Sequence, residues 1–522
     1  MIADMKRAVI DNAELWAEKI YLNSTPQEQK IALADARIKA AEVGAGAEFE
    51  KKINSKIRRE SKINIMSIYS PEEQFSEIKA AAVFGKLFQS ELRYNIISKC
   101  YYHYNGRFWE QDKGNINAHT LAKEFHSLLM QYAYSDIETD VQREAFLKFY
   151  GRYAKKTHRD TLLQDAITEL SISESDFDKN KDLFNCRNGT INLQTLELKD
   201  HDPEDMLTNY ADVNYIPGVK SQLWERFISD ILPGDKALQL YVQKALGYSL
   251  TGCPVLERMF IFYGQSTRNG KSTLLNSISH TIGDYAKAAP AEILQLKIRD
   301  SRNASEDLAR LSKCRFLTVS EPAQSMVFDV PLIKSLTGRD TITARRLYES
   351  SFEYTTKFSI FLNTNYLPRV LDDSLFSSDR VHVIPFTRHF KPEEQDTQLK
   401  AKLQTEENKS AILAWLIDGL RRYKVEGLKP PLTVCIATRE YVKSSDKLQL
   451  FIDEALEETD TPEMTVKECY ELYKNWCSTC GYTYENKTKF IELLQHKNMM
   501  LLSATVQGKT VRRVINGYKS AN

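Results

Sequence analysis

The sequence predicts a multidomain α/β protein, and three observations support this fold class. The chain has 522 residues, enough for three or four domains that each bury a core of their own. Residues 256–425 alternate strand-like and helix-like runs, which is typical of a parallel sheet covered by helices. Before and after that block, the pattern changes to short strands joined by turns and to separate helices. We therefore expect domains of different architecture on either side of a central α/β domain.

The N-terminal region, residues 1–90, is predicted to be helical. Residues 34–42 are its clearest helical stretch, and Ser70-Pro71 is typical of a helix start, with Ser70 as the N-cap. A basic cluster lies between them. We interpret it as a solvated helix face rather than a nucleic-acid contact, and it consists of Lys51, Lys52, Lys56, Arg58, Arg59 and Lys62.

Residues 91–220 are predicted to form an α+β domain that contains two hairpins. Aromatic residues between positions 101 and 109 flank Asn105-Gly106, and apolar residues flank Asn188-Gly189 in the same way. An Asn-Gly pair between apolar runs is a strong hairpin signal, because both residues tolerate positive φ. The aromatic side chains could stack on nucleic-acid bases, but we expect them to lie in the core.

Residues 221–425 are predicted to form the central α/β domain. Its first part is helical because apolar residues recur at helical spacing: Trp224, Phe227, Ile228 and Ile231, then Leu238, Leu240, Tyr241, Val242 and Leu246. Pro430-Pro431 marks the next boundary. In residues 430–522, two helical segments precede two short strands around Gln507-Gly508, and this order indicates a winged-helix-like module.

The composition excludes several classes of protein. Hydrophobic residues make up 42% of the chain and charged residues 27%, which is ordinary for a soluble globular protein, and the net charge of +1 indicates no particular partner. No run approaches the roughly 20 apolar residues of a membrane span, and the N-terminus lacks the apolar core of a signal peptide. Eight cysteines without regular spacing suit reduced thiols in an intracellular protein. Cys469, Cys477 and Cys480 could be zinc ligands, but with a single C-x2-C pair we expect them to be helix residues.

The most informative segment of the chain is residues 260–273. The apolar run 260–263 predicts a buried strand, Gly264 opens a turn, and a helical pattern follows from Leu274 to Ile282. Strand, glycine-bearing loop and helix in this order form a phosphate-binding loop, whose backbone N–H groups and helix N-terminus face an anion. The chain is therefore expected to bind a nucleoside triphosphate.

The expected nucleotide-binding residues are Gly264, Asn269, Gly270, Lys271, Ser272 and Thr273. Lys271 would reach the β- and γ-phosphates, and the Ser272 hydroxyl would ligate Mg²⁺. The usual spacing is G-x4-G-K-[ST], whereas five residues separate Gly264 from Gly270 here. We interpret this as a loop one residue longer. The alternative is a chance Gly-Lys-Ser turn.

Hydrolysis of a bound triphosphate also needs a carboxylate that orients water and a polar group near the γ-phosphate. The apolar run 315–321 ends in Glu321, which we predict to be this carboxylate and to lie near the Mg²⁺ site. A helix N-cap built by Ser320 and Glu321 is the alternative. A second apolar run, 358–365, ends in a polar tip, and there we favour Asn365 over Asn363 as the group near the γ-phosphate.

Cationic residues in the α/β domain suggest contacts with DNA. Arg345 and Arg346 fall near the turn between two extended runs, and Lys357 follows further on. Cations on a projecting hairpin suit a phosphate backbone, whereas surface ion pairs are the alternative for each residue taken alone.

Arg380 precedes the strand-like run 381–386. An arginine at the start of an edge strand could reach a neighbouring subunit's ATP and offset charge on the transferring phosphoryl group. The alternative is a salt bridge within the chain, with Asp372 or Asp373 as the partner.

The C-terminal stretch 481–522 contains seven lysines and arginines against two glutamates. Lys509, Arg512 and Arg513 lie on the predicted wing, where they would bind duplex phosphates.

The order of these segments resembles superfamily 3 helicases, and most closely the primase-helicase branch found in phages, plasmids and poxviruses. Five ordered motifs carry the resemblance: Asn269–Thr273; Ser320-Glu321-Pro322; Leu336–Asp340 with Ala344-Arg345; Asn363–Asn365 with Pro368; and Arg380 with Ile384-Pro385-Phe386. Residues 183–252 are similar to that branch's accessory domain, and the similar segments are Asn188-Gly189, Asp202–Asp205 and Leu250-Thr251-Gly252.

The resemblance implies an AAA+ P-loop motor that uses ATP and Mg²⁺, assembles as a ring, usually a hexamer, and moves 3′ to 5′ on single-stranded DNA. By position it implies that Lys271 and Ser272 bind phosphate and Mg²⁺, and that Glu321 polarises the attacking water. Asn365 would sense the γ-phosphate, and Arg380 would act on the ATP of a neighbouring subunit. Arg345 and Arg346 would track along DNA.

Three positions depart from the family pattern. The longer loop puts the role of Gly264 in question, Ser320 stands where many related ATPases have Asp, and Asp379 stands where relatives often have a second Arg. The primase domain that many relatives carry upstream is not among the predicted domains. We therefore expect no primer synthesis, and a separate primase or polymerase is a possible partner.

These observations predict an ATP-dependent replicative DNA helicase of a mobile genetic element, acting on single-stranded and forked or origin duplex DNA in the host cytoplasm. An ATP-gated protein that binds or melts an origin without processive unwinding is the alternative. The hairpin arginines favour the helicase, because only translocation needs contacts that cycle with ATP. A metabolic kinase is disfavoured, because no second substrate-binding constellation is present.

Overall fold

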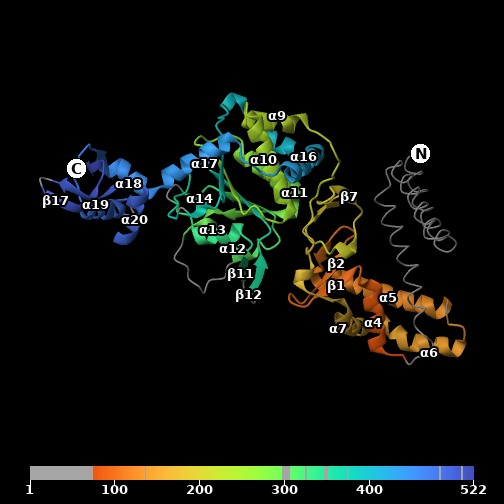
Figure 1. Cartoon of the computed structure of the whole chain (residues 1–522). Coiled ribbons are helices and arrows are strands. Elements are labelled where there is room, and N and C mark those ends of the chain that lie inside the picture. Colours follow the sequence, from red (N-terminus) through yellow and green to blue (C-terminus); the bar gives the residue numbers. More distant parts are fainter. Residues whose placement is uncertain are drawn as a thin grey trace. The chain divides into compact units, whose positions relative to one another are not determined.

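The computed structural model describes residues 75–521, with gaps at 136, 297–305, 324–325, 346–350, 373, 462, 481, 483 and 507–508 (Figure 1). Most of the predicted helical region 1–90, including its basic cluster and the Ser70-Pro71 helix start, lies outside these residues. Residue contacts divide the chain into two units. Among the described residues, the first unit comprises 75–192 and 197–210, and the second comprises 193–196 and 211–521.

The first unit combines helices with a four-stranded and a three-stranded sheet. Its helices are α4 (Glu77–Phe88), α5 (Ile116–Ser135), α6 (Asp140–Tyr150), α7 (Lys156–Asp165) and α8 (Ile167–Leu170). The larger sheet has the order β3-β2-β1-β4, in which β1 and β4 are parallel; its strands are β1 (Leu92–Asn95), β2 (Cys100–Tyr104), β3 (Trp109–Gln111) and β4 (Ser171–Ile172). The smaller sheet is antiparallel and consists of β5 (Leu183–Cys186), β6 (Gly189–Asn192) and β7 (Glu197–Lys199).

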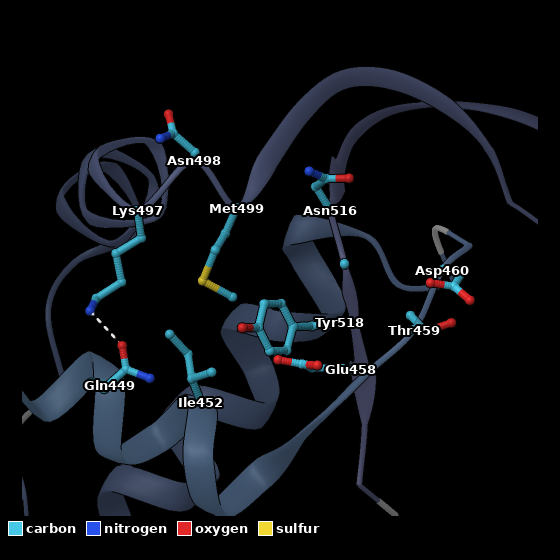
Figure 2. Close-up of a pocket in the computed structure, with 11 residues that line it drawn as sticks. Gln449, Ile452, Glu458, Thr459, Asp460, Lys497, Asn498, Met499, Asn516 and Tyr518 are labelled. Atoms are coloured by element: carbon cyan, nitrogen blue, oxygen red, sulfur yellow. Dashed lines mark hydrogen bonds between the residues drawn. The ribbon is translucent and has the colours of Figure 1, made fainter.

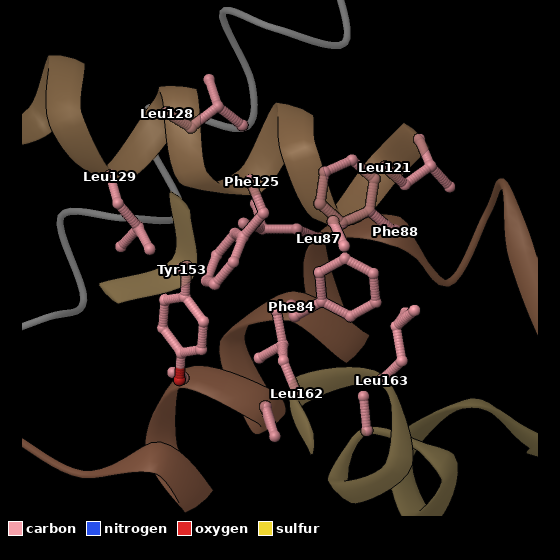
Figure 3. Packing of buried hydrophobic residues seen from close by; sticks show 14 of the residues in the cluster. Phe84, Leu87, Phe88, Leu121, Phe125, Leu128, Leu129, Tyr153, Leu162 and Leu163 are labelled. Carbon is pink, nitrogen blue, oxygen red and sulfur yellow. The ribbon is translucent and has the colours of Figure 1, made fainter. Parts of the chain in front are cut away.

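A core of aromatic and aliphatic side chains holds the helices of the first unit together (Figure 3). The buried residues of α5 recur at helical spacing between Ala118 and Ala133, so that one face of this helix packs inward. Phe125 of α5 meets Phe84 of α4 edge to face, with 5.5 Å between ring centroids. Truncating such a ring to Ala costs about 3–5 kcal/mol, so this contact is central to the fold of the unit.

Both predicted hairpins of the first unit are present. Asn105 Oδ1 accepts hydrogen bonds from the backbone N–H groups of Arg107 and Phe108, each at 3.0 Å, and so closes the turn between β2 and β3. The second turn joins β5 to β6, and Gly189 is required there because a Cβ would lie 2.4 Å from the carbonyl oxygen of Lys199. Tyr101, Tyr104 and Trp109 are buried, as predicted for core residues.

The second unit begins with two helices, α9 (Gln222–Ile231) and α10 (Lys236–Tyr248). The predicted inward face of α9 is buried, and Ser221 caps the helix by accepting a 3.1 Å hydrogen bond from the backbone N–H of Trp224. Helix α10 packs closely against α16 (Glu406–Glu426), because Gly247 leaves no side chain between the two backbones (Figure 1).

The centre of the second unit is a sheet whose strands all run parallel. Its order is β14-β8-β13-β10-β9, which is the fifth, first, fourth, third and second of these strands along the chain. The strands are β8 (Met259–Tyr263), β9 (Ala286–Pro290), β10 (Phe316–Ser320), β13 (Ser359–Thr364) and β14 (Val381–Pro385). The three inner strands are buried almost throughout, as expected for a parallel sheet covered on both faces. The predicted α/β alternation is therefore confirmed.

Further elements surround this sheet. The helices are α11 (Lys271–Ile282), α12 (Glu306–Ala309), α13 (Val330–Thr337), α14 (Ser374–Ser377), α15 (Leu399–Leu403) and α17 (Leu432–Ser445). Strands β11 (Thr341–Arg345) and β12 (Ser351–Thr355) form an antiparallel hairpin. Helix α17 packs on β14, where Thr438 Oγ1 accepts a 3.0 Å hydrogen bond from the backbone N–H of Val383.

The C-terminal segment after α17 has the order helix, strand, two helices, a hairpin and a last strand that pairs with the first, so the described part of residues 430–522 has four helices where two helical segments were predicted. It consists of α18 (Lys447–Ala455), β15 (Leu456–Glu458), α19 (Val466–Thr479), α20 (Lys487–His496), β16 (Met500–Val506), β17 (Lys509–Ile515) and β18 (Tyr518–Ser520). Cys469 and Cys477 are buried in α19 and Cys480 is its C-cap, so two of the three cysteines are helix residues, as expected. The two short strands predicted around Gln507-Gly508 are confirmed as β16 and β17.

A polar pocket of about 570 Å³ lies in this C-terminal segment (Figure 2). The ring of Tyr518 lies near Ile452 and Met499, and Lys497 Nζ donates a 2.8 Å hydrogen bond to Gln449 Oε1 at the rim. All lining residues come from positions 449–518, so the pocket is separate from the predicted phosphate loop. Among the described residues, no helix is long and apolar enough to cross a membrane.

Candidate nucleotide-binding site

The predicted phosphate loop connects the carboxyl end of β8 to the N-terminus of α11. Two of its positions require glycine. Gly270 has φ +86°, and a Cβ there would lie 2.3 Å from Ile231 Cγ2. A Cβ on Gly264 would lie 2.5 Å from Asn269 Nδ2 and 2.6 Å from the Phe386 carbonyl oxygen. Gly264 is therefore a close-approach position in spite of the longer loop.

The extra length of the loop is accommodated by the chain that follows β14. The carbonyl oxygen of Arg268 accepts a 3.0 Å hydrogen bond from the backbone N–H of Phe390, and that of Thr267 accepts a 2.8 Å bond from His389 Nδ1. On the inner side, Asn269 Nδ2 donates to the Ser266 carbonyl oxygen at 2.7 Å. Sequence reasoning missed these anchors, because no local pattern pairs the loop with residues about 120 positions later.

Lys271, the first residue of α11, is 3% exposed. Its Nζ donates to Asn365 Oδ1 at 2.8 Å and to the Gly264 carbonyl oxygen at 3.3 Å. Burial lowers the pKa of Lys271 to about 8, because the charged amine loses hydration. The structure thus brings the predicted phosphate-binding lysine together with Asn365, the favoured asparagine, which directly follows β13.

Ser272 follows Lys271 and is exposed at the helix N-terminus. Its Oγ accepts a 2.9 Å hydrogen bond from Asn363 Nδ2. Thr273 is partly buried on the next position of α11. Asn363, in β13, and Asn365, just after it, therefore contact different residues at the start of α11, since Asn363 meets Ser272 and Asn365 meets Lys271.

Glu321 lies directly after β10 and is exposed. It has φ +56°, a left-handed conformation that is uncommon for glutamate, and its backbone N–H donates to the Asn363 carbonyl oxygen at 3.0 Å. The N-cap alternative for Ser320 and Glu321 is wrong, because the next helix that the structure describes is α13, and Asp329 caps it. Hydroxyl and carboxylate oxygens are the donor types that Mg²⁺ takes, so Ser272 and Glu321 fit this ion in chemistry.

Arg380 lies at the other end of the sheet. Strands β14 and β8 are parallel with Val381 opposite Met259, so Arg380 is at the amino end, whereas the phosphate loop leaves the carboxyl end. A five-residue strand such as β8 separates the two ends by roughly 13 Å. The structure therefore does not bring Arg380 to the loop of its own chain.

Within the chain, Arg380 makes an ion pair with Glu257 at 2.6 Å and donates to Thr337 Oγ1 at 3.1 Å. The alternative of an intrachain salt bridge was thus correct in kind, but its partner is Glu257 instead of Asp372 or Asp373. Asp379 pairs with Arg258 and with His382. Burial and the nearby Arg258 charge lower the pKa of His382.

The predicted DNA-binding residues that the structure describes lie on two hairpins or next to one of them. Arg345 is exposed at the end of β11, Lys357 is partly buried after β12, and Arg346 lies outside the described residues. On β17, Arg512 and Arg513 are exposed, whereas the side chain of Lys509 lies outside what the structure describes.

Two families match parts of the chain. Residues 81–233 match the model described as "D5 N terminal like", and residues 262–380 match the one described as "Family of unknown function (DUF5906)". The first covers most of the first unit together with α9, and the second runs from β8 to Arg380.

Similar curated proteins include viral proteins that are named as helicases. The chain is 29% identical over 322 residues to "Putative helicase L207/L206" of Acanthamoeba polyphaga mimivirus, which covers 57% of this chain and 33% of the relative. It is 24% identical over 272 residues to "Putative helicase 022R" of Frog virus 3. This match covers 48% of this chain and 27% of the relative. It is also 24% identical over 372 residues to "Putative helicase 121R" of Invertebrate iridescent virus 3. This match covers 63% of this chain and 39% of the relative. The matched part thus spans roughly a third of the length of these relatives.

One solved structure has a similar fold across most of the chain. It is the apo structure of the NrS-1 C-terminal region, with a TM-score of 0.50 and 10% identity, and the match covers 84% of this chain and all of that one. The likeness concerns the mixed α/β fold alone.

Proposed function

We propose that the chain is the ATP-hydrolysing motor of a DNA helicase that acts in replication of a mobile genetic element, of the superfamily 3 AAA+ type. The observation that carries this proposal is the set of side chains at the carboxyl edge of the parallel sheet, where Lys271 donates a hydrogen bond to Asn365 and Ser272 accepts one from Asn363. Ligands of open α/β sheets bind at this edge. The viral relatives, which are named as helicases, and the "D5 N terminal like" match support a role in replication.

Nucleotide binding would replace contacts that the loop now makes with itself. Lys271 would exchange Asn365 Oδ1 and the Gly264 carbonyl oxygen for β- and γ-phosphate oxygens. Asn365 would then be released to hydrogen-bond the γ-phosphate or the attacking water. The backbone N–H groups at the start of α11 and its positive dipole end would stabilise the phosphate charge.

Hydrolysis needs a water oriented for in-line attack. Glu321 has the exposure and the position, directly after β10, to orient this water and accept its proton. Ser272 would hold Mg²⁺ with Glu321 nearby, and this ion neutralises charge that develops on the phosphate oxygens.

Arg380 would act on the ATP of a neighbouring subunit in a ring, usually a hexamer. Its position at the amino end of the sheet supports this, because the loop of its own chain is out of reach. In the single chain Glu257 holds the guanidinium, and an incoming γ-phosphate would compete for the same donor groups.

Arg345 at the end of β11, Arg346 next to it in the sequence and Lys357 after β12 would follow the backbone of single-stranded DNA, with movement 3′ to 5′. Lys509, Arg512 and Arg513 on the C-terminal hairpin would bind duplex phosphates in a winged-helix-like module. A separate primase or polymerase would complete the replication machinery.

The experiment is ATP hydrolysis by the full chain with and without single-stranded DNA, comparing wild type, Lys271→Ala and Glu321→Gln. We expect DNA-stimulated hydrolysis by wild type, loss of nucleotide binding in Lys271→Ala, and retained binding with about 10²–10⁴-fold slower turnover in Glu321→Gln. Equal turnover in wild type and Glu321→Gln would refute the role of this carboxylate.

An ATP-gated origin-binding protein is the second candidate. The exposed Arg512 and Arg513 favour it, because they belong to a segment with a hydrophobic core of its own apart from the sheet. Hydrolysis with duplex binding but without strand separation would support this candidate over the helicase.

A further inference from the structure

Ser272 has a side-chain partner that the motifs of the sequence did not assign. Many related ATPases carry an Asp directly before the catalytic Glu, and this chain has Ser320 there. In the structure, the contact to the Ser272 hydroxyl comes from the neighbouring strand β13, through Asn363 Nδ2 at 2.9 Å.

The sheet order makes this contact possible. Strand β13 lies between β8, which leads into the phosphate loop, and β10, which leads to Glu321. Asn363 pairs in register with Phe262 on one side and with Ser320 on the other. Its side chain can therefore reach the loop, and its backbone carbonyl oxygen accepts the 3.0 Å hydrogen bond from the N–H of Glu321. One residue thus connects both expected sides of the metal site.

The amide is suited to orient a hydroxyl. Asn363 is 5% exposed, so surrounding atoms restrict its rotation. A serine hydroxyl has two lone pairs and one O–H. When the Asn363 N–H group occupies one lone pair, the other is left for a metal ion and the O–H is left for a phosphate oxygen. Outer contacts of this kind fix the direction of a ligand atom.

We propose that Asn363 is the positioning residue for the Ser272 hydroxyl. The inference rests on the proposed function, because it assumes that Ser272 ligates the Mg²⁺ of a bound nucleotide. It assigns Asn363 and Asn365 different tasks: the first orients the metal ligand and the second contacts Lys271 and the γ-phosphate.

The test measures binding instead of turnover. A fluorescent ATP analogue is titrated into the full chain in EDTA and at a series of Mg²⁺ concentrations. Asn363→Leu keeps the approximate shape of the side chain and removes the donor, and Asn363→Ala is the second variant in case Leu prevents folding. We expect about 10- to 100-fold weaker apparent Mg²⁺ affinity, the range for loss of an outer-shell partner, with nucleotide affinity in EDTA unchanged.

Thr364→Val is the matched control. Thr364 is also buried on β13, and its hydroxyl bonds the backbone of Tyr366, so the variant loses a buried hydrogen bond beside the site without touching Ser272. We expect its Mg²⁺ affinity to equal that of wild type.

A double-mutant cycle with Ser272→Ala separates positioning from general stability. If Asn363 acts through Ser272, Asn363→Leu has no further effect on Mg²⁺ affinity in the Ser272→Ala background. Unchanged Mg²⁺ affinity in the single variant, an equal loss in EDTA and in Mg²⁺, or a full further loss in the Ser272→Ala background would each overturn the inference. Wild type that binds no nucleotide at all would instead overturn the proposed function, and the inference with it.

Discussion

The pKa of Lys271 gives a quantitative prediction for nucleotide binding. In the nucleotide-free protein, burial lowers this pKa to about 8. In a complex, phosphate charges favour the ammonium form and raise the pKa again. Nucleotide affinity is therefore fully developed below pH 8 and falls as the pH rises through 8, because binding must then first protonate the amine.

The size of the effect follows from the protonated fraction of free Lys271. With a pKa of about 8, this fraction is about 0.76 at pH 7.5 and about 0.03 at pH 9.5. Affinity should therefore fall about 25-fold over this range. Starting at pH 7.5 keeps the terminal phosphate ionised, since phosphomonoesters have a second pKa near 6.

The assay is a titration of fluorescent ATP analogue into the full chain at fixed Mg²⁺ and ionic strength, from pH 7.5 to pH 9.5. Lys271→Arg is the control, because a guanidinium stays protonated throughout, so its pH profile should be flat. A flat wild-type profile, or an equal fall in Lys271→Arg, would refute the reasoning.

Three further predictions concern single positions. Gly264→Ala should weaken nucleotide binding at least tenfold, because the added Cβ would lie 2.5 Å from a side-chain nitrogen of the loop. Gly151→Ala is the control, because a Cβ there has no atom within 4 Å. Equal nucleotide affinities of Gly264→Ala and wild type would contradict the close approach. Arg380→Ala should lose ATP turnover and regain part of it when mixed with a subunit whose own site is inactive but whose Arg380 is intact. Glu257→Gln, which removes only the intrachain partner of Arg380, should keep ATP turnover. Failure of the mixing test would argue against a site shared between subunits. Arg345→Glu should lower the slope of log affinity against log salt for single-stranded DNA by about 0.7 or more, the share of one phosphate contact, and an unchanged slope would remove the hairpin from the DNA path.

Features with a local signal were predictable from the sequence. The Asn105-Gly106 turn, the apolar strand before Gly264 and the helical pattern after Lys271 each lie within about 15 residues, and all three are present. The core location of Trp109 was likewise expected, since large aromatic residues on a hairpin usually pack inward.

Contacts that depend on strand order could not be predicted. The alternation of residues 256–425 indicates a parallel sheet, but it does not state that β13 lies beside β8, which is what brings Asn363 to Ser272. The placement of β14 on the other side of β8 likewise explains why Glu257, which no motif includes, is the partner of Arg380.

The most direct test of the central claim is ATP-dependent unwinding of a forked duplex with a 3′ single-stranded tail by the full chain, with Lys271→Ala beside wild type. The account predicts strand separation by wild type in ATP and Mg²⁺, and none by Lys271→Ala. Hydrolysis without strand separation would contradict the helicase and favour the origin-binding protein, and absence of hydrolysis would contradict the assignment of the longer loop as a nucleotide site.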